Sequence, residues 1–129
     1  MYSTANSYQT HGLYSAVQTA TPHQLINLLF DGALRQLTTA QFALQQNNLS
    51  DKGVAISKAL DIFDGLRSAL NMEQGGQIAQ NLDALYDYMQ RQLIQANLQN
   101  DTGRIEEVIH LLREIKTGWE AIADVPESA

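Results

Sequence analysis

Residues 21–47 read TPHQLINLLFDGALRQLTTAQFALQQN, and this stretch predicts a long amphipathic helix. Thr21 suits an N-cap, Pro22 suits the first helical position, and the glutamine three residues after Thr21 completes a capping box. Apolar residues then recur in steps of four and three as far as Leu44, so they share one helical face. Asn47 follows this face and can supply a left-handed C-cap.

The dipeptide Asp31-Gly32 interrupts this helix with a pair of residues that is typical of turns. The apolar series keeps its phase on both sides of the pair, whereas a turn would break that phase. We therefore predict that the helix continues through Gly32, at a cost of about 1 kcal/mol relative to alanine. Either the glycine is simply tolerated, or a neighbouring helix passes close to it.

Three further apolar stripes follow and predict three more helices. The second helix is expected to begin near Ser50 and Asp51. The third begins at Ile78, after a loop over residues 71–77, and the fourth is capped by Asp101 or by the threonine that follows it.

The order of these elements predicts an all-α fold. No segment alternates with a period of two, so no strand is expected. The short connections favour antiparallel neighbours, that is, an up-down-up-down four-helix bundle. The predicted organisation is a mobile N-terminal arm over residues 1–20, the bundle over residues 21–125 and a short tail over residues 126–129.

The composition excludes several classes of function. The chain of 129 residues carries a net charge of −6, which disfavours nucleic acid as a partner. It has no cysteine, so it has neither disulfides nor thiolate chemistry, and it has no apolar run that would predict insertion into a membrane. Asp31 is the first charged residue, so a basic signal-peptide region is absent, and a cytoplasmic setting is expected.

Motifs of catalysis are also missing, and we predict that the protein is not an enzyme and binds no metal or cofactor. Glu107 and His110 form only half of a di-iron motif, and no second such pair occurs. The Gly75-Gly76 pair lacks the lysine of a phosphate-binding loop. One alternative is a histidine phosphotransfer bundle that uses His110, although Glu114 stands where that class needs a glycine and would repel a phosphoryl group.

The apolar faces are wider than the three positions in seven that a bundle helix needs. We therefore expect part of this surface to form grooves that bind another helix, rather than core alone. Trp119 lies in the most regular stripe and is predicted to be core. The candidates for the groove, each of which could equally pack in the core, are Leu29, Leu66, Tyr86, Met89, Leu93 and Ile109.

The N-terminal arm is expected to dock weakly. Ordering about 20 residues costs roughly 20–40 kcal/mol in backbone entropy. Three tyrosines, Tyr2, Tyr8 and Tyr14, recover at most about 15 kcal/mol by burial. We expect Tyr8 and Tyr14 to anchor an arm that a ligand can displace. Arm amides that are as protected from hydrogen exchange as the core would contradict this hypothesis.

Several segments together resemble the flagellar secretion chaperone family FliS. In the first helix they are residues 19–26 (TATPHQLI) and 29–33 (LFDGA). In the third they are residues 75–79, 81–82 and 85–89, then Ala96-Asn97 and Asn100-Asp101. In the last helix they are residues 105–108 and 111–112 and Trp119. The resemblance covers nearly the whole chain.

The resemblance implies a cytoplasmic four-helix protein that binds the C-terminal region of newly made flagellin. It implies that the protein prevents premature polymerisation and presents flagellin to a component of the flagellar type III export gate. It also implies that the arm covers part of the binding surface when flagellin is absent. Other flagellar regulators are possible partners, and a monomer and a dimer with exchanged arms or domains both stay open.

Overall fold

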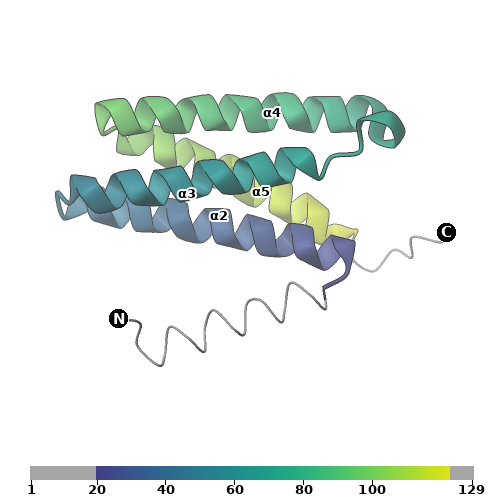
Figure 1. Ribbon diagram of the computed structural model, residues 1–129, viewed down its shortest axis with the longest axis horizontal. Coiled ribbons are helices and arrows are strands. Elements are labelled where there is room, and N and C mark those ends of the chain that lie inside the picture. Colours follow the sequence, from purple (N-terminus) through teal and green to yellow (C-terminus); the bar gives the residue numbers. More distant parts are fainter. Residues whose placement is uncertain (1–19, 123–129) are drawn as a thin grey trace.

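Four helices make up the part of the chain that the computed structural model describes, residues 20–122. They are α2 (Pro22–Gln45), α3 (Leu49–Ser68), α4 (Met72–Gln99) and α5 (Thr102–Ala121), and no strand occurs among these residues (Figure 1). The predicted all-α class is confirmed. The expected arm anchors Tyr8 and Tyr14 lie outside the described residues.

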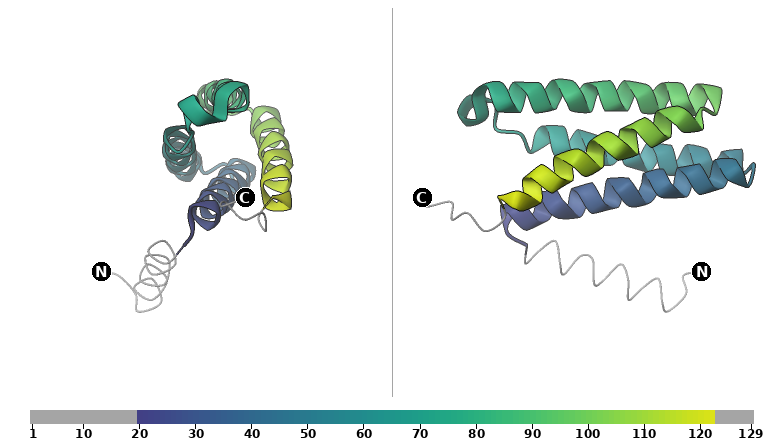
Figure 2. Two further views of the ribbon diagram at one scale, coloured as in Figure 1. Left: turned by 90° about the vertical axis from the view of Figure 1, so that its right-hand side faces the viewer. Right: turned by 180° about the vertical axis from the view of Figure 1, so that it is seen from behind.

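The four helices form a ring in which each helix packs against the helices before and after it, with α5 closing the ring onto α2 (Figure 2). Successive helices run in opposite directions, so the predicted up-down-up-down order is confirmed. The helix α5 runs obliquely: it begins beside the end of α4 and finishes beside the start of α2. As a result α4 and α5 diverge toward one end of the bundle.

Local signals set most of the helix ends. Thr21 Oγ1 accepts a hydrogen bond from the backbone N–H of Gln24 at 3.1 Å, and the Gln24 side chain accepts from the Thr21 N–H at 3.0 Å, so the capping box is present. Asp101 caps α5 by accepting from the backbone of Gly103. Asn47 takes the predicted left-handed conformation, with φ of 58°.

One boundary agrees with the prediction and one differs. The helix α3 begins at Leu49, next to the expected Ser50, and the Asn48 side chain caps it by accepting from the backbone three residues on. The predicted loop over residues 71–77 is wrong in part: α4 begins with a turn at Met72 and has a single break at Gly76, with φ of 52° and ψ of −131°. Two adjacent glycines suggested a loop, yet only the second one leaves the helical region.

The core lies along the axis of the ring and is built from all four helices. The glycine in α2 marks a close approach, as the second of the two interpretations proposed: a Cβ at Gly32 would lie 3.3 Å from Ile62 Cδ1 of α3. The largest fully buried side chains are Phe30, Leu37, Ile56, Phe63, Leu66, Met89, Leu93, Ile105, Val108 and Leu112.

Candidate partner-binding groove

The helices α4 and α5 diverge at the end of the bundle where α3 connects to α4 (Figure 2). An open apolar groove lies at this end. Its volume is about 470 Å³, within the range of ~300–1,000 Å³ that is usual for ligand sites. Most of its lining side chains are aliphatic or aromatic. They are Ile26, Phe30, Leu66, Ala69, Leu70, Asn71, Gly75, Ile78, Ala79, Leu82, Tyr86, Glu114, Ile115, Gly118, Trp119 and Ile122.

The helical repeat builds the two walls of the groove. Ile78, Leu82 and Tyr86 are spaced four residues apart, so they line one face of the first half of α4. Ile115 and Trp119 do the same on the last part of α5. Ile78 is 73% exposed, which leaves a large apolar side chain without a covering partner among the described residues.

Trp119 joins this groove to α2. Its indole ring stacks on His23, with 4.2 Å between ring centroids and 8° between planes. The indole N–H donates to the His23 carbonyl oxygen at 3.1 Å. The prediction that Trp119 belongs to the core is therefore wrong: it is half-buried and lines the groove, because α5 leans onto α2 at this point.

Tyr86 lies at the base of the groove and is 2% exposed. Its ring packs against Phe63 of α3, with 6.1 Å between centroids. Burial disfavours the charged phenolate and raises the pKa of Tyr86 to about 12. Tyr86 therefore stays neutral throughout the physiological range and forms part of the base of the groove.

The six described groove candidates separate into three groups. Leu66 and Tyr86 are buried and also line the groove. Leu29 faces Gly65 at the seam between α2 and α3, where its methyl groups lie 3.9 Å from a Cβ built on that glycine. The core contains Met89, Leu93 and Ile109, which are at most 4% exposed.

The groove residues that the sequence analysis missed lie near helix ends. The main ones are Ile78 in the second turn of α4, Ile115 and Gly118 on α5, and Ile122, the C-cap of α5. Each aliphatic residue among them continues a stripe that also contains core residues, so spacing alone could not separate them. Their position near the ends of the apolar stripes could have identified them, since the end of a long stripe extends past the neighbouring helix.

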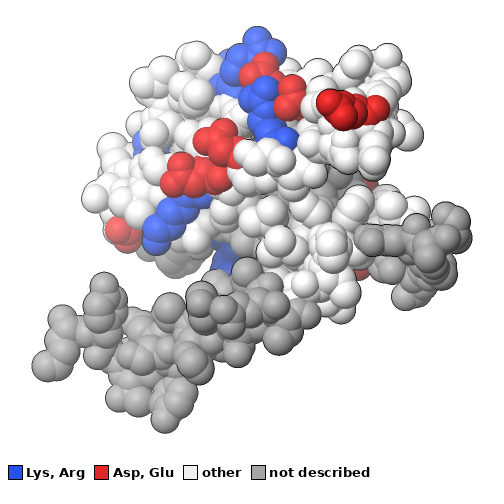
Figure 3. Space-filling model, turned by 45° about the vertical axis from the view of Figure 1, so that its right-hand side comes forward, with Lys and Arg blue, Asp and Glu red and all other residues white. Residues whose placement is uncertain are grey.

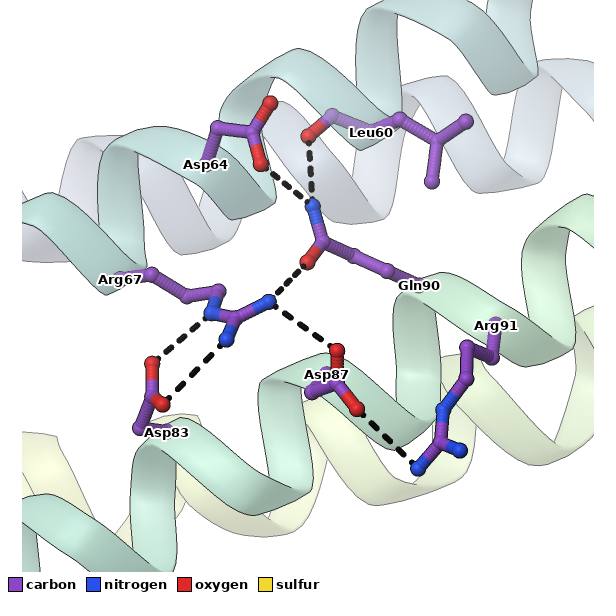
Figure 4. Close-up of polar contacts among 7 residues, drawn as sticks. All are labelled: Leu60, Asp64, Arg67, Asp83, Asp87, Gln90 and Arg91. Carbon is purple, nitrogen blue, oxygen red and sulfur yellow. Dashed lines mark hydrogen bonds and ion pairs between the residues drawn. The ribbon is translucent and has the colours of Figure 1, made fainter.

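A polar cluster joins α3 to α4 beside the groove (Figure 4). Arg67 makes a two-pronged contact with Asp83, with Nε at 2.8 Å and Nη2 at 3.3 Å from its two carboxylate oxygens. Hydrogen bonding with Arg67 lowers the pKa of Asp83 and raises that of Arg67. Gln90 accepts from Arg67 at 2.9 Å and donates to Asp64 at 2.7 Å.

A second polar cluster joins α4 to α5, away from the groove. The Tyr88 hydroxyl donates to Glu107 at 2.5 Å, and the Gln92 amide donates to the same carboxylate at 3.1 Å. The hydrogen bond raises the pKa of Tyr88 and lowers that of Glu107. Together the two clusters join α4 to both of its neighbours, but at different positions along the helix. The contacts with α3 begin at Asp83, and those with α5 begin at Tyr88.

Many charged side chains of the described residues lie in pairs of opposite sign. On the face seen in Figure 3, basic and acidic side chains lie next to one another in a band, and uncharged atoms cover most of the rest. The ion pairs include Arg91 with Asp87 at 3.0 Å and Lys116 with Asp31 at 2.7 Å.

His110 receives no support as a phosphotransfer site. Its side chain is 77% exposed on α5, and Nε2 lies 3.4 Å from the Glu114 carboxylate, which would repel a phosphoryl group. Among residues 20–122, no group of three or more His, Cys, Asp or Glu side chains could hold a metal ion. None of the helices described is at once long and apolar enough to cross a membrane.

The part of the chain described is an all-helical bundle with an open apolar groove, an arrangement that is typical of modules that bind an amphipathic helix. The family model described as flagellar protein FliS matches residues 4–126. The chain belongs to the FliS family, whose members are chaperones of flagellar secretion and not enzymes.

Individual relatives are similar over most of their length. The flagellar secretion chaperone FliS of Salmonella typhimurium is 50% identical over 118 residues, which cover 91% of this chain and 87% of the relative. FliSB of Pseudomonas aeruginosa is 45% identical over 116 residues, covering 90% and 92%. FliS of Bacillus subtilis is 33% identical over 105 residues, covering 81% and 77%.

Proposed function

We propose that this protein binds the C-terminal region of newly made flagellin in the cytoplasm, keeps it from polymerising and presents it to the flagellar type III export gate. Membership of the FliS family supports a role in flagellar secretion. The observation that carries the binding proposal is the apolar groove between α4 and α5.

The groove suits an amphipathic helical segment. Such a segment places apolar side chains at intervals of three and four residues, and the α4 wall repeats at the same interval with Ile78, Leu82 and Tyr86. The polar residues of the lining, Asn71 and Glu114, are few, so most of the contact is apolar. Burial of that surface provides the driving force.

The proposed mechanism is passive. Binding withdraws the helix-forming surface of flagellin from other flagellin molecules, and release follows when the export gate competes for or pulls on the bound segment. Affinity then depends on a few buried apolar anchors rather than on hydrolysis of a nucleotide.

Calorimetric titration with a peptide of the last ~45 residues of the cognate flagellin tests this function, because helix-in-groove binding buries apolar surface and gives a negative heat-capacity change. The chain contains one tryptophan, Trp119, and it lines the groove. Its fluorescence emission should shift to shorter wavelength when the peptide excludes water from it.

Gly118 provides matched variants. It lines the groove, and a Cβ at this position would meet no atom within 4 Å. Gly118→Leu should fill the groove and weaken peptide binding at least about tenfold. Gly118→Ala should bind like the unmodified chain, while both variants favour the helix by up to about 1 kcal/mol.

The two variants separate blockage from misfolding, since neither should lower the free energy of unfolding. Absence of peptide binding by the unmodified chain would refute the proposed function. Equal binding by both Gly118 variants would show instead that flagellin binds at another surface.

A further inference from the structure

The groove lies at the end of the α4–α5 interface where, among the described residues, no hydrogen bond joins the two helices. Three hydrogen bonds cross this interface among residues 20–122. Tyr88 and Gln92 of α4 donate to Glu107 on the first turns of α5, and Arg104 of α5 donates to the Gln92 amide oxygen. None of these residues lines the groove. The first half of α4 therefore receives no polar support from α5.

The other wall of the groove is fastened to a different helix. Trp119 donates to the His23 carbonyl of α2, and Lys116 pairs with Asp31 of α2 at 2.7 Å. The last part of α5 is thus tied to α2 rather than to α4. The separation of the two walls depends on what holds α4 from its other side.

Arg67 of α3 provides that support (Figure 4). Its guanidinium reaches Asp83 through two nitrogens, and Nη1 also lies 3.2 Å from Asp87 and 2.9 Å from Gln90. These three acceptors lie on successive turns of α4. Gln90 also donates to the Leu60 carbonyl of α3 at 3.2 Å, so α3 and α4 are joined over two turns.

The cluster is in register with the groove. Arg67, Asp83 and Asp87 each follow a residue of the lining, namely Leu66, Leu82 and Tyr86. The polar contacts lie on the outer face of α3 and α4, and the preceding side chains turn inward to the groove. The break in helical geometry at Gly76 separates the first turn of α4 from the part of the helix that Arg67 contacts.

We propose that Arg67 and Asp83 are positioning residues that set the distance of the α4 wall from α5 and hold the groove ready for its partner. The role of the pair in holding α4 is independent of the partner, whereas its effect on affinity rests on the proposed flagellin binding. A loosened α4 populates the binding-competent groove for a smaller fraction of the time, and the apparent affinity falls by that fraction.

Asp83→Asn tests the proposal because it keeps the shape of the side chain and removes its charge. Hydrogen exchange of the full chain should show amides 77–86 exchanging about tenfold faster, with the amides of α2 unchanged. The flagellin peptide should bind about five- to tenfold more weakly. A modest loss of global stability does not by itself change the affinity of a protein that stays almost wholly folded.

Two further variants complete the design. Glu106→Gln removes one negative charge at the far end of the bundle, where Glu106 of α5 accepts a hydrogen bond from Gln41 of α2 at 2.7 Å. The amide oxygen of the glutamine can still accept this bond. This variant should leave both measurements unchanged. Arg67→Lys keeps the positive charge but not the fork geometry, so it should give intermediate exchange and affinity.

Unchanged exchange over residues 77–86 in Asp83→Asn would overturn the proposal, whether or not the peptide binds. Faster exchange with unchanged peptide affinity would overturn the link to the groove. If the unmodified chain fails to bind the peptide, the proposed function fails, while the exchange measurement still decides whether the pair holds α4.

Discussion

Alkaline pH should destabilise this protein through Tyr86, because the folded structure resists ionisation of a phenol that ionises readily in the unfolded chain. Burial raises its pKa from 10.0 to about 12. The folded state therefore retains a proton that the unfolded state releases above about pH 10, so the free energy of unfolding decreases as pH rises. The contribution is fully present below about pH 10 and is lost by about pH 12.

The expected magnitude follows from the two-unit difference. Each unit corresponds to about 1.36 kcal/mol, so the full loss is roughly 2–3 kcal/mol, about half of it by pH ~11. This is a large part of the total stability of ~5–15 kcal/mol that is typical of a small domain.

Urea denaturation at a series of pH values between about pH 9 and 11.5 measures this loss in the unmodified chain and in two variants. Tyr86→Phe keeps the ring and removes the titrating hydroxyl, so its stability should decline less steeply. Tyr88→Phe, at an exposed position, should keep most of the decline. Parallel curves for the unmodified chain and Tyr86→Phe would refute the reasoning, since they would show that Tyr86 ionises alike in both states.

Three further outcomes are expected. Gly65→Ala should raise the free energy of unfolding by about 1 kcal/mol, because alanine favours the helix and the added Cβ meets only Leu29 methyl groups at 3.9 Å; a lower melting temperature would contradict this. Gly76→Ala should lower the free energy of unfolding by about 1–3 kcal/mol, measured by urea denaturation, since φ of 52° with ψ of −131° strains any residue that carries a Cβ. Acid should weaken the seam between α3 and α4: Arg67 lowers the pKa of Asp83, so its contribution is present above the usual pKa and is lost as pH falls through the lower folded value. In Asp83→Asn the free energy of unfolding, measured by urea denaturation, should fall less steeply as the pH is lowered. An unchanged dependence on acidic pH would show that the pair adds nothing to stability.

Helix positions followed from the sequence because their signals are local. The capping box at Thr21 and the cap at Asp101 each involve residues within three positions of one another. The apolar stripes specified four helices, and the short connections between them specified antiparallel order. The wide stripes also indicated that some apolar surface would remain outside the core, and Ile78 and Leu98 are indeed 73% and 74% exposed.

Membership of the groove could not be obtained in this way. Leu112 and Ile115 lie three residues apart on one stripe of α5, yet Leu112 is fully buried and Ile115 lines the groove. The difference arises from the oblique course of α5, whose second half diverges from α4. Met89 and Leu93 are core for the complementary reason, since they lie where the two helices are still close.

The sequence by itself thus determined the helices, their order and the family resemblance, because these depend on residue types at fixed spacing along one chain. Tertiary structure alone decided where the groove opens and which helix holds each wall. Arg67 and Asp83 are sixteen residues apart, and Trp119 and His23 are ninety-six apart. Such pairs meet through the crossing angles of packed helices, which result from the whole core and which no local pattern of residues encodes.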